Sequence, residues 1–218
     1  EIIKKCREEV GSDFAISIKM NSADFQKGGF SPEDSIQVAK LFSDSGIDNI
    51  EISGGTYEQP RLLGLDKVSI NPKRSENRKE STIAREAYFL SYAEEIAKVV
   101  NIPLMVTGGF RTKEGMEAAL ADGACEIVGV GRPLCANPYA IKELLAGQID
   151  ELPKYEKTLS IGPWWLSPTS PFRLIQAINA FSAQAWFYQQ IKKMGKGLMP
   201  DLNLKPWKAF REDAKADQ

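Results

Sequence analysis

A pattern repeated along the first two thirds of the chain constrains its fold more than any other feature. A short apolar run is followed by a glycine-rich or polar loop and then by a segment with helical spacing. The four runs cover residues 14–20, 47–53, 102–108 and 126–132. Alternating strands and helices are typical of a parallel sheet, and nearly continuous apolar strands suit a sheet covered on both faces. The sequence therefore predicts an α/β fold with four parallel strands.

Helix start signals follow these runs. Ser31 supplies an N-cap hydroxyl, Pro32 suits the first helical position, and Asp34 is the acidic residue three positions after the cap. Further helices are expected over residues 90–100, from Thr112 to Gly123 and from Asn137 to Gly147.

Two segments depart from the alternation. Residues 58–80 hold two prolines and a cluster of charges, which predicts a long surface loop. Residues 163–218 hold all four tryptophans and a stretch with apolar residues at helical spacing. We expect a helical extension whose tryptophans are core residues, packed on the main domain, because they would otherwise expose much apolar area. The predicted domains are residues 1–150 and 151–218.

Composition excludes several classes of protein. The 218 residues carry 28 Lys and Arg against 29 Asp and Glu, a net charge of -1, which gives no reason to expect nucleic acid or an anionic membrane as partner. No apolar run approaches the length of a membrane span. Three cysteines without paired spacing argue against disulfides or zinc and favour the cytoplasm. The absence of histidine removes histidine-based catalysis and metal binding; we expect no metal site.

Two consecutive glycine-rich loops form a candidate phosphate site. The first comprises Thr107, Gly108, Gly109 and Phe110, and the second runs over residues 129–133. Glycine allows close backbone approach to a ligand, a following helix offers free N–H groups, and an arginine in the second loop adds a guanidinium suited to phosphate. Successive loops of this kind hold phosphate in (β/α)8 barrels after the seventh and eighth strands. The spacing alone leaves an alternative open, in which these are ordinary turns and the arginine forms a surface ion pair.

Lys19 is a cation inside an otherwise apolar strand. Because an unpaired buried ammonium is costly, Lys19 requires an anion. One reading is a ligand contact at the carboxyl end of a barrel strand. The other is an ion pair with a neighbouring carboxylate such as Asp24 or Glu51.

Four blocks taken together resemble, in order, the second half of the old yellow enzyme family, the FMN-dependent NAD(P)H:flavin oxidoreductases. The blocks are residues 18–30, 50–57, 106–110 and 128–133. The resemblance implies a TIM (β/α)8-barrel type of fold with about the last four βα units present, followed by the helical extension. It also implies FMN at the carboxyl-end mouth, NAD(P)H as reductant, and a small-molecule electron acceptor such as an activated alkene. A homo-oligomer is a further expectation.

The resemblance also implies roles for individual residues. Lys19 matches the basic residue facing the N1/O2 edge of the flavin, where negative charge develops on reduction. The cofactor-binding residues implied in addition are Gly108, Gly109, Phe110, Gly131 and Arg132, with the glycines and Arg132 at the FMN phosphate and Phe110 against the cofactor. Ser53, Gly54 and Gly55 match the strand end beneath the flavin, and Tyr57 either edges the substrate pocket or packs.

The chain also departs from the family pattern. The region that supplies the substrate-binding pair and the proton donor in the family has no counterpart here, so the catalytic residues are unknown. Two readings therefore follow: part of an FMN oxidoreductase, or a non-catalytic FMN- or phosphate-binding half-barrel module. A half barrel leaves unpaired strand edges, which a longer protein, a second copy or the helices of residues 163–218 would cover. We favour a fragment of a longer protein.

Overall fold

The computed structural model describes residues 1–24, 29–53 and 89–216. These residues form two compact units, one up to Val130 and the other from Gly131 onward. The second unit thus begins ahead of residue 151, where the sequence predicts the start of the helical extension. The predicted loop of residues 58–80 lies outside the described residues, as do Gly54, Gly55 and Tyr57.

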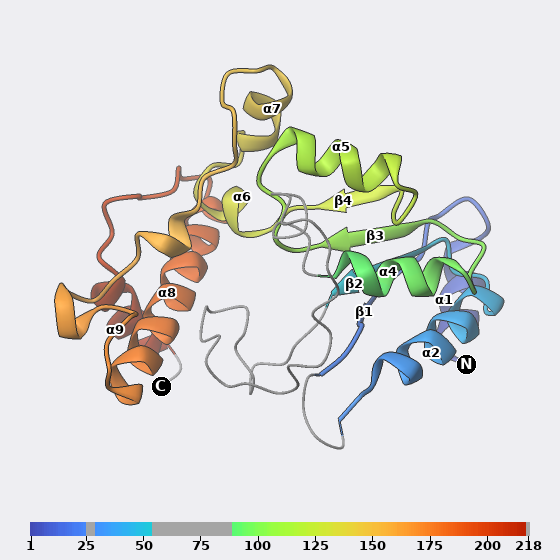
Figure 1. Ribbon diagram of the computed structural model, residues 1–218, viewed down its shortest axis with the longest axis horizontal. Coiled ribbons are helices and arrows are strands. Elements are labelled where there is room, and N and C mark those ends of the chain that lie inside the picture. The colour runs from blue at the N-terminus through green and yellow to red at the C-terminus, as the bar shows by residue number, and fades with distance from the viewer. Residues whose placement is uncertain (25–28, 54–88, 217–218) are drawn as a thin grey trace, which may run out of the picture. The chain divides into compact units, whose positions relative to one another are not determined.

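The first unit is built on a four-stranded parallel sheet with the order β1-β2-β3-β4 (Figure 1). The strands are β1 (Ser17–Asn21), β2 (Asn49–Ser53), β3 (Leu104–Thr107) and β4 (Ile127–Gly129). The predicted parallel sheet is therefore confirmed, with shorter strands. The fourth predicted run was too long, because Arg132 is the first residue of a helix rather than the last of a strand.

The helices described in the first unit are α1 (Ile2–Val10), α2 (Pro32–Asp44), α4 (Leu90–Ala97) and α5 (Lys113–Ala121). The predicted caps are present. The Ser31 hydroxyl accepts a hydrogen bond from the Asp34 N–H at 3.1 Å, and the Asp34 carboxylate accepts one from the Ser31 N–H at 3.0 Å. Thr112 caps α5 by accepting from the Gly115 N–H at 3.1 Å. These bonds satisfy amide donors that the first helical turn leaves free.

The two faces of the sheet differ in character. On one face, apolar strand residues pack with the helices in a single cluster that includes Ile50, Ile52, Leu104, Val106, Ala39 and Ile96. The other face carries the alternate strand residues, among them Lys19, Glu51 and Thr107, which are exposed or half-buried. The predicted covering of both faces is therefore not seen for this second face in the described residues, where exposed or half-buried positions alternate with buried ones as the pleat requires.

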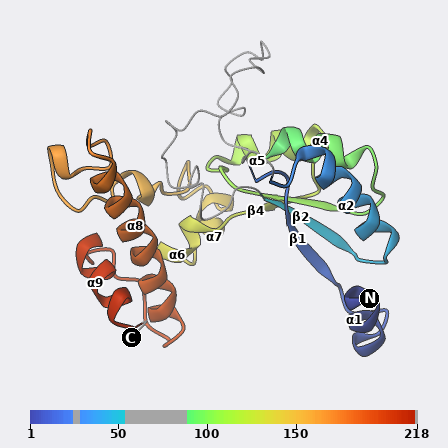
Figure 2. The same cartoon turned by 90° about the horizontal axis from the view of Figure 1, so that it is seen from below.

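The second unit is helical. It contains α6 (Arg132–Ala136), α7 (Ala140–Leu145), the 3-10 turns η2 (Tyr155–Lys157) and η3 (Trp164–Leu166), α8 (Arg173–Met194) and α9 (Pro206–Ala216). The long helices α8 and α9 lie side by side in both views (Figures 1 and 2). Their core is a cluster around Trp186, with Leu204, Ala185, Ala209, Leu159 and Ala136.

The prediction that all four tryptophans are core residues was wrong for three of them. Trp186 is 1% exposed, whereas Trp164 is 89% exposed and Trp165 and Trp207 are also exposed. Trp164 and Trp165 lie in the three-residue turn η3, none of whose residues is buried.

Among the described helices, none combines the length and apolar character that crossing a membrane requires.

Candidate functional site

The loop after β3 depends on two consecutive glycines. Gly108 and Gly109 both adopt positive φ, 132° and 88°, and the N-cap of α5 follows three residues later. Such a conformation is open to glycine and disfavoured for other residues. The predicted pair of glycines therefore has a local structural cause, and it leaves the loop without side chains where a ligand would approach the backbone.

The neighbouring strand end is equally tight. A Cβ atom built on Gly129 would lie 1.8 Å from the Thr107 hydroxyl oxygen, and one built on Gly108 would lie 3.3 Å from a ring carbon of Phe89. The Thr107 hydroxyl is buried, and no described group forms a hydrogen bond with it. A buried hydroxyl without a partner is destabilising, so a ligand polar group at this strand end would satisfy it.

Phe110 follows the two glycines, and its side chain is 1% exposed within the apolar cluster of the first unit. In this structure it anchors the loop by packing. The predicted contact between Phe110 and the cofactor stays a prediction.

Arg111 is a buried residue of this loop to which the sequence patterns did not lead. Its side chain is 6% exposed, and its guanidinium donates to the Phe110 carbonyl at 2.7 Å. Its place between a glycine turn and a helix cap could have marked Arg111 as a candidate site residue in the sequence. A buried guanidinium requires polar or charged partners, so an arginine at such a position indicates a polar site.

Lys19 lies opposite Glu51 on the adjacent parallel strand, and its ammonium donates a short hydrogen bond to the Glu51 carboxylate. The side chain of Lys19 is 55% exposed, and that of Glu51 is 20% exposed. Asp24, the other predicted partner, accepts instead from the Asn21 amide and the Phe30 N–H, at 3.1 and 3.0 Å. Of the two carboxylates considered, the structure thus selects Glu51.

Gly131 and Arg132 belong to the second unit. Gly131 precedes α6 with φ of -114°, so its backbone does not require glycine. Arg132 lies 3.9 Å from the Glu156 carboxylate, and both side chains are partly buried. The Cys135 thiol donates to the Gly131 carbonyl at 3.7 Å, and burial raises its pKa. The ion-pair reading of Arg132 is therefore present in the structure, and its role at a phosphate stays a prediction.

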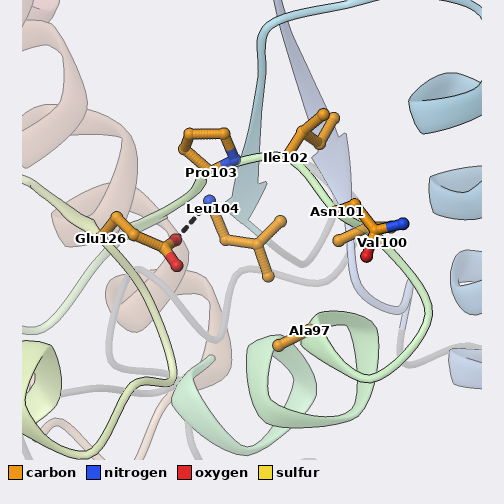
Figure 3. Close-up of a pocket in the computed structure, with 7 residues that line it drawn as sticks. All are labelled: Ala97, Val100, Asn101, Ile102, Pro103, Leu104 and Glu126. Atoms are coloured by element: carbon orange, nitrogen blue, oxygen red, sulfur yellow. Dashed lines mark hydrogen bonds between the residues drawn. The ribbon is translucent and has the colours of Figure 1, made fainter.

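A cavity of about 330 Å³ lies at the opposite end of the sheet, where β3 begins. Figure 3 shows its lining, which includes Ala97, Ile102 and Pro103, and the Glu126 carboxylate, which accepts from the Leu104 N–H at 2.8 Å. None of the predicted site residues lines it. This cavity is consequently separate from the candidate site at the carboxyl ends of the strands.

Of the predicted residues, Gly108, Gly109 and Phe110 form one continuous loop. Lys19 stands on the polar face of the same sheet, while Gly131 and Arg132 lie in the other unit. The described residues thus define an α/β protein in which Lys19 and the glycine loop after β3 belong to one parallel sheet.

Comparison with known proteins shows which family this chain resembles in sequence. The NADH-dependent flavin oxidoreductase iliE of Hypocrea jecorina is 39% identical over 150 residues, which cover 66% of this chain and 34% of that protein. The NADH-dependent flavin oxidoreductase iccE of Talaromyces variabilis is 30% identical over 200 residues, which cover 90% of this chain and 46% of that protein. No family model matches the chain.

A solved structure gives the same picture. The complex of 2-naphthoyl-CoA reductase with 2-naphthoyl-CoA is similar with a TM-score of 0.54 and 26% identity, covering 69% of this chain and 21% of that one. The predicted barrel-type fold with part of the barrel present is thereby confirmed. The chain belongs to the family of the NADH-dependent flavin oxidoreductases. It spans between a third and a half of the length of these two curated relatives.

Proposed function

We propose that this chain is part of an FMN-dependent NAD(P)H oxidoreductase. The observation that carries the proposal is the loop after β3, where two consecutive positive-φ glycines precede a capped helix in a chain related to flavin oxidoreductases. The residues present fit FMN. The glycines leave room for a phosphate against backbone N–H groups, and Lys19 supplies a cation on the same sheet.

The roles proposed for the residues follow from their chemistry. Gly108 and Gly109 allow the backbone to approach the phosphate, and Phe110 holds their loop in place from the core. Gly131 and Arg132 contribute a second phosphate-binding segment, in which the guanidinium provides a forked donor. Lys19 stabilises negative charge at the flavin N1/O2 edge. FMN, when bound, accepts hydride from NAD(P)H and passes electrons to the acceptor.

The remaining expectations belong to the same proposal. An activated alkene or a similar small molecule reoxidises the flavin, the protein works in the cytoplasm, and copies of it associate. The three cysteines support the reducing compartment, since those described are free thiols. The exposed apolar side chains of the second unit, such as Leu174 and Phe181, support association with another surface.

An FMN titration of the purified protein, followed by quenching of flavin fluorescence, tests the proposal. We expect saturable binding that Arg132→Ala weakens about tenfold or more, because a charge-assisted contact to phosphate is lost. Arg173→Ala is the matched control, since this arginine begins α8 and has no proposed role. Absence of binding by folded protein would contradict the proposal.

Reduction by NAD(P)H separates the two candidate functions. An oxidoreductase loses its yellow absorbance when NAD(P)H is added without oxygen, and Lys19→Ala slows that loss. A non-catalytic FMN-binding module, the alternative, would bind FMN that NAD(P)H leaves unreduced. That alternative draws its support from the ion pairs that already occupy Lys19 and Arg132.

A further inference from the structure

The four strands of the sheet contain one cation and one anion, and these two residues are paired with each other. Lys19 on β1 and Glu51 on β2 are direct partners in the parallel register, and their side chains form a hydrogen-bonded ion pair. The remaining residues of the four strands are uncharged. Within the four described strands, the charged side chains are therefore these two alone.

The side-chain amide N–H groups of Asn49 and Asn21, on either side of the pair, donate to other residues. Two register positions toward the amino end, on the same face, the Asn49 amide donates to the Ser17 hydroxyl at 2.7 Å. Toward the carboxyl end, the Asn21 amide donates to Asp24 at 3.1 Å. Glu51 is less exposed than Lys19, so the carboxylate is the more enclosed member of the pair.

We propose that Glu51 is a tuning residue, which partly neutralises Lys19 and thereby lowers the reduction potential of the bound flavin. This inference rests on the proposed function. A lone ammonium beside the flavin would favour the reduced form, because hydride arrival adds negative charge at N1 and O2. A carboxylate bonded to that ammonium opposes the effect, since its own charge acts on the same developing anion with the opposite sign.

The measurable consequence is a change in the relative affinity of the two flavin forms. Glu51→Gln keeps the shape of the side chain and one of its two acceptor oxygens, and it removes the charge. We expect the ratio of oxidised to reduced FMN dissociation constants to rise about tenfold, a positive shift of about 30 mV for a two-electron couple. Glu51→Asp keeps the charge and should stay within about twofold of the unsubstituted protein, a small part of that tenfold effect. Lys19→Gln should move the ratio in the opposite direction.

The experiment is a spectroelectrochemical titration of the FMN-loaded protein with each of these variants. Glu126→Gln serves as control, because it removes a carboxylate of the same sheet at the end where the strands begin. An unchanged or lowered potential in Glu51→Gln would overturn the inference while leaving FMN binding intact. So would equal shifts in Glu51→Gln and Glu126→Gln, which would indicate a general effect of net charge. If the folded protein binds no FMN, the titration described above already contradicts the proposed function, and this inference is overturned with it.

If Glu51→Gln lowers the yield of folded protein, the pair Glu51→Asp and Glu51→Asn decides, because both shorten the side chain equally and only the second removes the charge. A purely structural role predicts the same potential in the two variants. The tuning role predicts a higher potential in Glu51→Asn than in Glu51→Asp.

Discussion

Thr107 and Gly129 are register partners on adjacent parallel strands, and the Thr107 hydroxyl occupies the place where a side chain at Gly129 would begin. A Cβ atom at Gly129 would also lie 2.8 Å from the terminal methyl group of Met105. Threonine is stiff about its first side-chain bond, so it cannot easily turn away. Glycine at position 129 is thus required by the neighbouring strand, although its own backbone angle is unexceptional.

The first prediction is that Gly129→Ala destabilises the protein by about 1–3 kcal/mol, the usual cost of overpacking. Urea unfolding followed by circular dichroism measures the change in the free energy of unfolding. Gly131→Ala is the control, because no described atom lies within 4 Å of the position that its new methyl group would take, and its φ is negative. Similar losses in both variants would contradict the assignment of the clash to Thr107.

A second prediction concerns the loop after β3. Gly108→Ala combines an unfavourable φ of 132° with a contact of 3.3 Å to the Phe89 ring, and we expect a loss of about 2–3 kcal/mol. Gly123→Ala has a positive φ of 70° and open space around it, so its cost should be about 1 kcal/mol. Thermal unfolding of the two variants compares them. If Gly108→Ala loses no more free energy of unfolding than Gly123→Ala, the loop after β3 adapts to the methyl group, which would contradict the prediction.

A third prediction is a pH dependence at the amino end of the sheet. The Ile16 N–H and the Arg7 guanidinium both donate to the Asp48 carboxylate, and these bonds lower the pKa of Asp48 below its ordinary value of 3.8. Since the pKa is lower in the folded than in the unfolded protein, the stabilisation is complete above the unfolded value. It is lost as the pH falls through the folded value. Asp48→Asn should therefore be less stable at neutral pH, with the difference narrowing below about pH 4.

Urea unfolding at several pH values tests this behaviour. The control is Asp44→Asn, which removes an exposed partner of Lys40 on α2 and should change stability by no more than about 0.5 kcal/mol. If the loss in the free energy of unfolding of Asp48→Asn stays constant down to the lowest pH, the hydrogen bonds to Asp48 stabilise the protein independently of its charge, which would contradict the prediction.

The local signals in the sequence predicted the first unit well. The Ser31 and Thr112 caps, the glycine turns and the four strands all follow from short-range rules, and each is present. The predicted strand ends were less accurate, because pairing with the neighbouring strand decides where a strand stops. β4 ends at Gly129, and Arg132 begins helix α6. The choice of Glu51 over Asp24 as partner of Lys19 needed the register between β1 and β2, which the sequence did not contain in readable form.

The second unit shows where composition misleads. Four tryptophans predicted four buried anchors, yet burial depends on which side of a helix or turn each residue takes, and only Trp186 is enclosed. Its position is specific. The Trp186 indole N–H donates to the Leu204 carbonyl at 2.9 Å, and its ring meets Phe187 edge to face with centroids 5.2 Å apart.

The last prediction follows from these contacts. Trp186→Phe removes the donor and leaves the Leu204 carbonyl buried without its partner, in addition to leaving a small cavity. We expect a loss of about 2–3 kcal/mol in the free energy of unfolding. Trp164→Phe, at an indole that is 89% exposed, should stay within about 0.5 kcal/mol of the unsubstituted protein. Equal effects of the two substitutions, measured by urea unfolding, would mean that the cluster around Trp186 does not hold α8 and α9 together. The contacts of α8 with α9 make the larger effect at Trp186 the expected one.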